Sequence, residues 1–202
     1  MIAEKSEALA SRHYFDREFG RAAVKLLPSE YYVTTAAKPV LMMTVLGSCV
    51  SACLHDPLAG VTGMNHFMLP DESDGGMAHP DAMRYGAHAM DVLVRELVRA
   101  GASSERLQAK VFGGAAVLPN MTSLNVGDRN ANFVLRYLDS QNIDLYAQDL
   151  GGVHARRVAL ISENGRVVVR KLRAPAELGQ VRSAEQELLR RLARGDSIGE
   201  AR

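Results

Sequence analysis

The chain is poor in several features that would point to a particular class of function. It has no tryptophan, and aromatic residues make up only 5% of the sequence, so it offers no obvious stacking surface for single-stranded nucleic acid. Its 24 basic residues nearly balance 23 acidic ones, and a net charge of +1 creates no field that would attract nucleic acid or an anionic membrane. The composition therefore favours neither kind of partner.

Long apolar runs are also missing, and cysteine is scarce. No apolar segment is long enough to span a bilayer, and the N-terminal residues lack the uninterrupted apolar core of a secretory signal. We therefore expect a cytoplasmic protein. The only two cysteines, Cys49 and Cys53, make a poor disulfide framework and should remain thiols in a reducing compartment.

What the sequence does contain is the pattern of one ordinary globular domain, with 47% apolar and 23% charged residues. Helical spacing of apolar residues predicts helices over 81–100 and 128–138. Apolar runs and alternation predict strands over 31–35, 40–46, 50–55, 61–69, 107–112 and 143–148, and Asn164-Gly165 predicts a hairpin of 157–162 with 167–172. We expect an α/β (α+β) sandwich of mixed, largely antiparallel strands packed with helices.

The pattern divides the chain into three segments. Residues 1–27 are weakly patterned and are expected to be an N-terminal extension, and residues 28–172 are expected to be the folded domain. Residues 173–202 are charged and are expected to be a C-terminal tail, in which 187–194 can form an amphipathic helix. Residues 70–80 are rich in Gly, Asp and Pro, which predicts a long loop.

One stretch concentrates reactive residue types. In LGSCVSACLHDPLAGVTGMNHFMLP, residues 46–70, Gly47 and Ser48 precede Cys49, and His66 lies in the next apolar run. If 50–55 and 61–69 form a hairpin with a loop at 56–59, Cys49 lies directly opposite His66 on the same face. An imidazolium beside a thiol lowers the thiol pKa, which is what a cysteine nucleophile needs.

Two other interpretations of this stretch stay open on spacing alone. A single cysteine and histidine in apolar strands are most often core residues, and Cys53, inside its strand, fits that reading best. Four side chains could also be metal ligands, but their spacing matches no usual zinc pattern; they are Cys49, Cys53, His55 and His66. We expect no metal site.

Several separated motifs, in one order, resemble the CheD family of chemoreceptor glutamine deamidases. They are PSEYYVT (28–34), LGSCV (46–50), HDP (55–57), GMNHFMLP (63–70), RYG (84–86), KVFGGA (110–115), VGDRN (126–130) and DLGG (149–152). The resemblance covers residues 28–172, so we expect this segment to be a CheD-like deamidase domain. The first motif departs from the family at Ser29, where glycine is more usual.

The resemblance implies a protein-glutamine glutaminase that converts selected glutamines of methyl-accepting chemotaxis receptors to glutamate, with no metal or organic cofactor. It implies Cys49 as the nucleophile and His66 as its base. It further implies receptors as partners, a membrane reached only through them, and regulation by a CheC-type phosphatase in some bacteria. The rival from another class is a catalytically weak adaptor that binds receptors or such a phosphatase.

The third residue of the family's catalytic arrangement is displaced in this sequence. Some family members have a threonine six residues before the cysteine, where this chain has Met43, and Thr44 comes one place later. Neighbouring residues of a regular strand point to opposite faces, so either the register differs locally or another group orients His66. Thr44 is the candidate, with Ser48 or a backbone carbonyl next.

Overall fold

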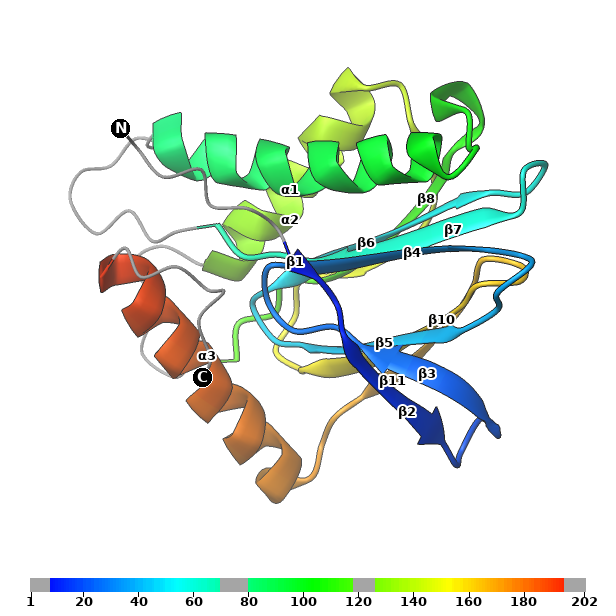
Figure 1. The fold of residues 1–202 in the computed structure, drawn as a ribbon. Helices are drawn as coiled ribbons and strands as arrows, with labels where there is room; N and C mark the ends of the chain where they lie inside the picture. Colours follow the sequence, from blue (N-terminus) through cyan, green and yellow to red (C-terminus); the bar gives the residue numbers. More distant parts are fainter. Residues whose placement is uncertain (1–7, 70–79, 118–125, 195–202) are drawn as a thin grey trace.

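Two β-sheets pack face to face in the computed structural model, which describes residues 8–69, 80–117 and 126–194 (Figure 1). The first sheet has the order β1-β4-β7-β6-β8-β9, formed by Ala8–Leu9, Glu30–Thr35, Val61–His66, Val50–Asp56, Gln108–Gly113 and Asp144–Leu150. The second has the order β11-β10-β5-β3-β2, formed by Arg166–Lys171, Arg156–Ile161, Leu41–Leu46, Arg21–Lys25 and Arg12–Asp16. The helices are α1 (Pro80–Arg99), α2 (Val126–Ser140) and α3 (Pro175–Arg194), with a short 3₁₀ turn η1 at Ser104–Arg106.

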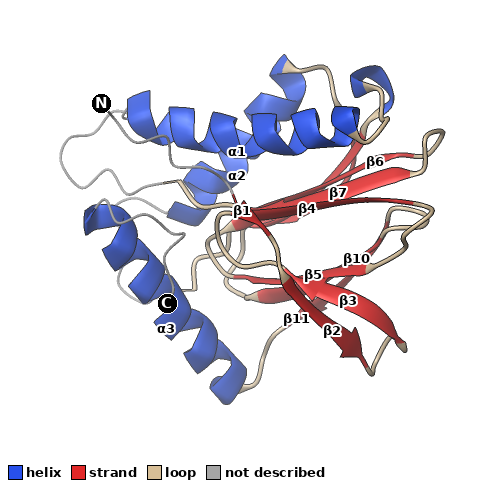
Figure 2. Ribbon diagram, viewed as in Figure 1, coloured by secondary structure: helices blue, strands red, loops and turns tan. Residues whose placement is uncertain are grey.

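Helices α1 and α2 cover the outer face of the six-stranded sheet, so the fold has a helical layer over two sheets (Figure 2). Their apolar stripes pack against one face of β6, β7 and β8 in the largest core cluster, which includes Val50, Leu54, Leu93 and Phe133. A second core fills the space between the sheets. Most strand pairs are antiparallel, while β1–β4, β3–β5 and β8–β9 are parallel. The predicted α+β sandwich is confirmed.

The strong sequence patterns correspond to helices and strands of the structure, but three further strands lie in segments with weak patterns. Helices α1 and α2 and the β10–β11 hairpin form where the patterns predict them. Strands β1, β2 and β3 were not predicted. Of these, β2 is an edge strand with mostly exposed residues and shows no clear alternation. The domain boundary at residue 28 stays a prediction, but β3 precedes it and pairs with β5. Residues 70–79 of the predicted loop lie outside the described residues.

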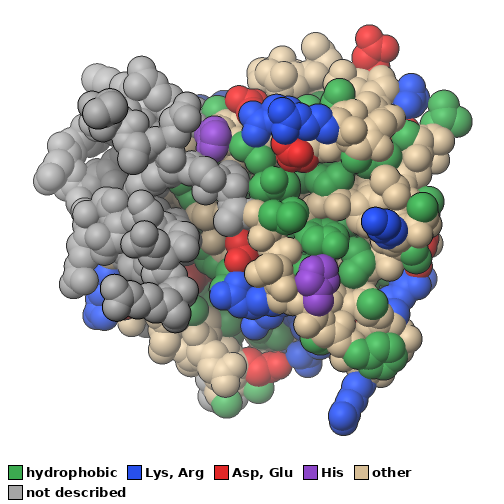
Figure 3. Space-filling model, in the orientation of Figure 1, with side chains coloured by type: hydrophobic (Ala, Val, Ile, Leu, Met, Phe, Trp, Pro, Cys, Tyr) green, Lys and Arg blue, Asp and Glu red, His purple; other side chains and the backbone are tan. Residues whose placement is uncertain are grey.

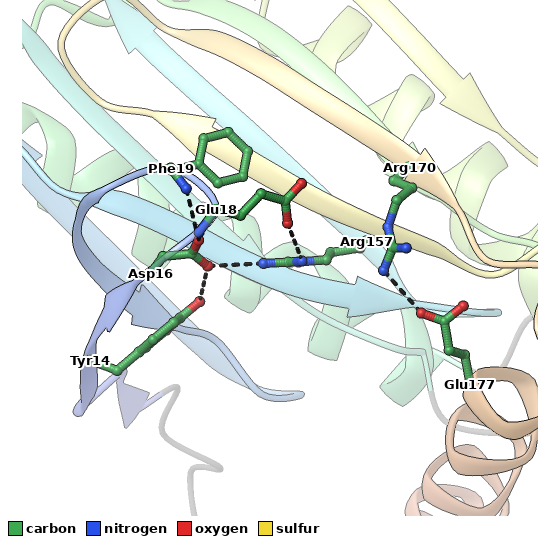
Figure 4. Close-up of polar contacts among 7 residues, drawn as sticks. All are labelled: Tyr14, Asp16, Glu18, Phe19, Arg157, Arg170 and Glu177. Carbon is green, nitrogen blue, oxygen red and sulfur yellow. Dashed lines mark hydrogen bonds and ion pairs between the residues drawn. The ribbon is translucent and has the colours of Figure 1, made fainter.

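The C-terminal helix is longer than its apolar pattern suggests. It begins at Pro175 rather than near residue 187, and it runs across one end of the sandwich (Figure 1). It is joined to β11 by an exposed ion pair between Arg170 and Glu177, at 3.0 Å (Figure 4). Among the described residues, no helix is long and apolar enough to pass through a membrane.

A polar network lies over the outer face of the five-stranded sheet. Arg157 bonds the buried Asp16 at 2.9 Å and Glu18 at 2.8 Å, and Tyr14 donates to the same Asp16 carboxylate at 3.3 Å (Figure 4). On the molecular face of Figure 3, basic side chains are scattered among acidic and apolar ones. The described residues on that face therefore form no basic patch of the kind that binds nucleic acid.

The chain crosses from the second sheet to the first at the end of the sandwich where β7 finishes. The first crossing follows β3, at Leu26–Ser29, and another follows β5, at Gly47–Cys49. His66 ends β7, which is the neighbour of β4 and β6. Residues from both crossings therefore meet His66 at one end of the sandwich.

The opposite end of β6 is held by a buried carboxylate. Asp56, fully buried, accepts hydrogen bonds from Arg106 at 2.7 Å and from the backbone N–H groups of Ser103, Leu58 and Ala59. Burial alone raises the pKa of this carboxyl, but these donors together hold it far below its usual range. The interaction fixes the β6–β7 turn to the loop before β8.

We expect Arg106→Ala to lower the free energy of unfolding by about 1–3 kcal/mol, because it removes the charged partner of a carboxylate that stays buried. Urea unfolding at pH 7 measures this. The matched control is Arg99→Ala, which breaks an exposed pair with Glu96 and should cost less than about 0.5 kcal/mol. Equal effects of the two variants would show that Asp56 does not depend on its arginine.

Candidate active site

The loop that carries Cys49 is fixed through its backbone carbonyls. The N–H of Gly114 donates to the carbonyl of Cys49 at 2.8 Å, and the N–H of Ala115 donates to that of Gly47 at 2.7 Å. The carbonyl of Ser48 accepts from the side chain of Asn130 at 2.8 Å. All three carbonyls of the loop are thus bound to neighbouring segments, which leaves the N–H groups of Ser48 and Cys49 free to point elsewhere.

Close backbone approach at this loop requires glycine on the opposing segment. A Cβ at Gly113 would lie 2.1 Å from the carbonyl oxygen of Cys49, and Gly113 has a φ of 113° that L side chains rarely adopt. Gly114 also has positive φ, at 67°. The two glycines therefore form the turn and also allow the close approach to the cysteine loop.

His66 and Thr44 face one another across the gap between the sheets. The Thr44 hydroxyl lies 2.8 Å from Nδ1 of His66 and donates to the carbonyl of Leu26 at 3.0 Å. A hydroxyl has one proton, so when it donates to Leu26 it accepts from an Nδ1–H. His66 then carries its lone pair on Nε2, which has no hydrogen-bond partner among the described residues. This is the tautomer that a base for a thiol needs.

Strand alternation explains why Thr44 rather than Met43 reaches the histidine. On β5, Met42 belongs to the core between the sheets, and Met43 belongs to the cluster on the outer face. Thr44 therefore points inward like Met42. The residue at the position expected from the family points away from His66, and its neighbour supplies the hydroxyl.

The predicted register of the β6–β7 hairpin is wrong by two residues. Cys53 pairs with Met64 and Val50 with Phe67, so the loop is 57–60 and Cys49 lies diagonal to His66 rather than opposite it. A shift of two residues preserves the face, because side chains alternate with period two. Cys49 and His66 accordingly still share one cavity, of about 260 Å³.

Burial sets the protonation states in this cavity. Both side chains are buried, and burial lowers the pKa of His66 to about 4, with the Leu26 carbonyl opposing the shift. Burial raises the pKa of the Cys49 thiol well above its ordinary value, and the charge of nearby Glu185 raises it further. In this state the pair is a neutral thiol and a neutral imidazole.

Helix α3 forms one wall of the same cavity, through Gln180, Val181, Ala184 and Glu185. The Glu185 carboxylate accepts hydrogen bonds from the backbone N–H of Ser48 and from its hydroxyl, the latter at 3.1 Å. Burial raises the pKa of Glu185. The hydrogen bonds from Ser48 and from the backbone N–H of Cys49 lower it and so oppose that rise. The N–H groups of Ser48 and Cys49 therefore both point toward the Glu185 carboxylate.

The other sequence candidates take structural positions. Cys53 is buried in the core between the sheets, where burial raises its pKa to about 12, as expected of a core residue. His55 lies at the far end of β6, where its Nδ1 is 2.7 Å from the Thr62 hydroxyl. Within residues 8–69, 80–117 and 126–194, no group of three or more His, Cys, Asp or Glu side chains is placed to hold a metal.

Sequence reasoning missed two supporting residues. Asn130 bonds Ser48 and also accepts from the N–H of Leu69, so it holds the cysteine loop rather than only the loop before its own helix. Arg156, buried, donates to the carbonyls of Gly113 and Gly151 and pairs with an acidic side chain of β9. Polar residues in the motifs VGDRN and DLGG gave a signal, but their partners are distant in sequence.

Comparison with known proteins identifies similar chains. The family model described as CheD chemotactic sensory transduction matches residues 68–171. A Burkholderia vietnamiensis protein named probable chemoreceptor glutamine deamidase CheD is 58% identical over 166 residues, which cover 82% of this chain and 67% of that protein. A protein of the same name from Cupriavidus metallidurans is 54% identical over 189 residues, which cover 93% of this chain and 85% of that protein. Another, from Bordetella petrii, is 55% identical over 186 residues, which cover 92% of this chain and 82% of that protein.

The buried state of His66 predicts a pH-dependent stability. The unfolded chain binds a proton near pH 6.5 and the folded chain only near pH 4, so stability falls as the pH drops through that window. Between pH 7 and 5 the natural protein should lose about 2 kcal/mol more than His66→Gln, measured by urea unfolding at both pH values. Equal losses would mean that His66 is protonated, or hydrated, in the folded protein.

Proposed function

The chain belongs to the CheD family, and from that premise we propose that it is a protein-glutamine deamidase that acts on chemoreceptors. The relatives that carry this name align over most of the chain. The family-model match begins at residue 68, after the cysteine and histidine. The roles of individual residues therefore rest on the geometry of the cavity.

The observation that carries the proposal is that Cys49 and His66 line one cavity, in which the Thr44 hydroxyl is hydrogen-bonded to Nδ1 of His66. A nucleophile, a base with its lone pair on the free nitrogen, and a group that orients the base are the three parts of this chemistry. A threonine that could not reach His66 would favour a catalytically weak adaptor, but the Thr44 hydroxyl lies 2.8 Å from Nδ1 of His66.

In the proposed reaction, His66 Nε2 takes the proton of the Cys49 thiol as the sulfur attacks the carboxamide carbon of a glutamine side chain. The C–N bond then breaks, and the imidazolium gives its proton to the leaving ammonia. Water attacks the resulting thioester with His66 as base, which releases glutamate and the free thiol. No metal or organic cofactor enters these steps.

The developing oxyanion needs preorganised donors. The N–H groups of Ser48 and Cys49 face the cavity side of the loop, and the bound carbonyls of that loop hold them there. Backbone donors of this kind stabilise charge in the transition state without reorganisation. We assign them as the oxyanion hole.

The proposal includes the setting of the reaction. The enzyme would work in the cytoplasm, on the cytoplasmic domains of methyl-accepting receptors, and it would meet the membrane only through them. A CheC-type phosphatase as a second partner stays a prediction from the family resemblance. The decisive assay incubates the protein with receptor cytoplasmic domains and measures glutamine-to-glutamate conversion by peptide mass spectrometry.

The two cysteines should separate in that assay. Cys49→Ala should abolish conversion because it removes the nucleophile, and Cys53→Ala should retain most of it because Cys53 is a core residue. Circular dichroism of both variants confirms that they fold. Loss of activity in a folded Cys53→Ala protein, with Cys49→Ala active, would reverse the assignment.

Thr44→Val keeps the β-branched shape and removes only the hydroxyl that orients His66. We expect turnover to fall roughly ten- to a thousand-fold, which corresponds to about 1.4 to 4 kcal/mol of transition-state stabilisation. Thr44→Ser, which restores a hydroxyl, should recover much of the loss. Unchanged kinetics of Thr44→Val would show that another group orients the imidazole, without touching the role of Cys49.

A further inference from the structure

Glu185 is an ionisable group of the cavity wall that the proposed mechanism does not use. It comes from α3, far from the cysteine loop in sequence, and its side chain is buried against Ser48. No salt bridge to it is formed within the part of the chain that the structure describes. Its second oxygen, Oε2, has no hydrogen-bond partner there either.

This burial is costly for the fold. A carboxylate removed from water without a cation or a full set of donors destabilises the protein, and burial accordingly raises the pKa of Glu185. An apolar side chain as long as that of glutamate would close the same wall without that cost, whereas alanine would leave the wall open. The structure of the helix alone therefore gives no reason for a carboxylate here.

The backbone around the carboxylate is shaped to admit it. A Cβ at Gly47 would lie 2.3 Å from Oε1 of Glu185 and 2.7 Å from its carboxyl carbon. Gly47 is not among the residues with positive φ, so the glycine serves space and not backbone conformation. The space that the missing side chain leaves is taken by the carboxyl carbon and Oε1 of Glu185, together with a methyl group of Val117 at 2.8 Å.

The Glu185 carboxylate has the chemistry of the deamidation product, because a glutamate side chain is what remains when a glutamine loses ammonia. Its oxygen accepts from the Ser48 N–H, which is one of the two donors assigned to the oxyanion hole. Cys49 and His66 line the same cavity. An internal glutamate thus lies where the mechanism needs a substrate side chain.

We propose that Glu185 occupies the binding site of the substrate's side-chain carbonyl, a site formed by Gly47 and the N–H groups of Ser48 and Cys49, and that α3 is an internal competitor which leaves before a receptor glutamine binds. The identity of the substrate in this assignment rests on the proposed function. The covering of Cys49 by the helix does not depend on it.

The attachment of α3 suits a segment that can be displaced. Among the helix side chains that the structure describes, Val181 is buried and Leu178 partly buried, in a small cluster apart from the two main cores that also holds Ala115, Val117, Ala155 and Leu172. Apart from the Glu185–Ser48 bonds, the described residues of the helix make a hydrogen bond from Arg182 to the Val117 carbonyl, at 2.9 Å, and the exposed pair between Arg170 and Glu177. Exposed pairs contribute little to stability.

The bound helix also holds the thiol in its unreactive form. The charge of Glu185 adds to burial in raising the pKa of Cys49. When the carboxylate leaves, both the solvent exclusion and the repulsion of a thiolate are relieved. Displacement of α3 therefore opens the site and makes its nucleophile easier to ionise in one step.

The first test measures Cys49 alkylation by iodoacetamide in the full chain at pH 7, followed by peptide mass spectrometry. Glu185→Ala should be labelled at least about tenfold faster than the natural protein, because thiolate and access both increase. The matched control is Glu187→Ala, on the same helix with an exposed side chain, which should label at the natural rate. Equal rates for all three proteins would overturn the proposal.

Receptor kinetics separate this proposal from the function on which it builds. Glu185→Ala should lower KM for the receptor domain more than it changes kcat, as expected when a competitor of the substrate is removed. Faster labelling without deamidation by any variant would defeat the function and leave the covering of Cys49 intact. Normal deamidation with unchanged labelling and unchanged KM would support the proposed function and overturn the covering of Cys49 by α3.

A second variant covers the case in which Glu185→Ala does not fold. Glu185→Gln keeps the shape and presents a carboxamide to Cys49. The thiolate should add to its carbon, the C–N bond should break, and ammonia should leave with a proton from His66, after which water restores glutamate. Mass spectrometry should find glutamate at position 185 in this variant, and glutamine there when Cys49→Ala is added. Glutamine that persists at position 185 in protein that deamidates receptors would overturn the assignment.

Discussion

The hydrogen bond between Thr44 and His66 spans the two sheets, and the chemistry of the cavity depends on it. It joins β5 of one sheet to β7 of the other at the end where the chain crosses between them. The bond exists because both side chains point inward, and it has a direction because the Thr44 proton goes to Leu26. A register slip of one residue in β5 or in β7, within its own sheet, would turn Thr44 or His66 out of the cavity.

Local patterns predicted most of the strands, but not the contacts that support the cysteine loop. The place of Cys53 inside the predicted strand correctly indicated a core residue, and helical spacing located α1 and α2. The roles of Asn130 and Arg156 depend on partners that are distant in the chain, and no periodicity encodes such pairs. The edge strand β2 was not predicted, because a mostly exposed strand has no apolar face and so shows no alternation of apolar and polar residues.

The same limit applies to Glu185. From the sequence it is one of several charges in an amphipathic segment, and only the fold brings it to Ser48. Gly47 carries a partial signal in the sequence, because a glycine beside a nucleophilic cysteine leaves room for a substrate carbonyl. The room is present, and in the structure a carboxylate of the same chain fills it. Sequence reasoning thus identified the space without its occupant.

The two-residue error in the β6–β7 register did not disturb the placement of Cys49 and His66 in one cavity. The pair is thus specified by the parity of two positions on neighbouring strands and not by their being opposite one another. During evolution, a paired slip of two residues in this hairpin would keep both side chains inward, whereas a slip of one would separate them in a single event. The pairing register of β6 with β7 should therefore change by two residues at a time in related enzymes. A β-bulge in β6 or β7 shifts the register by one residue, so it should be among the changes that selection removes first.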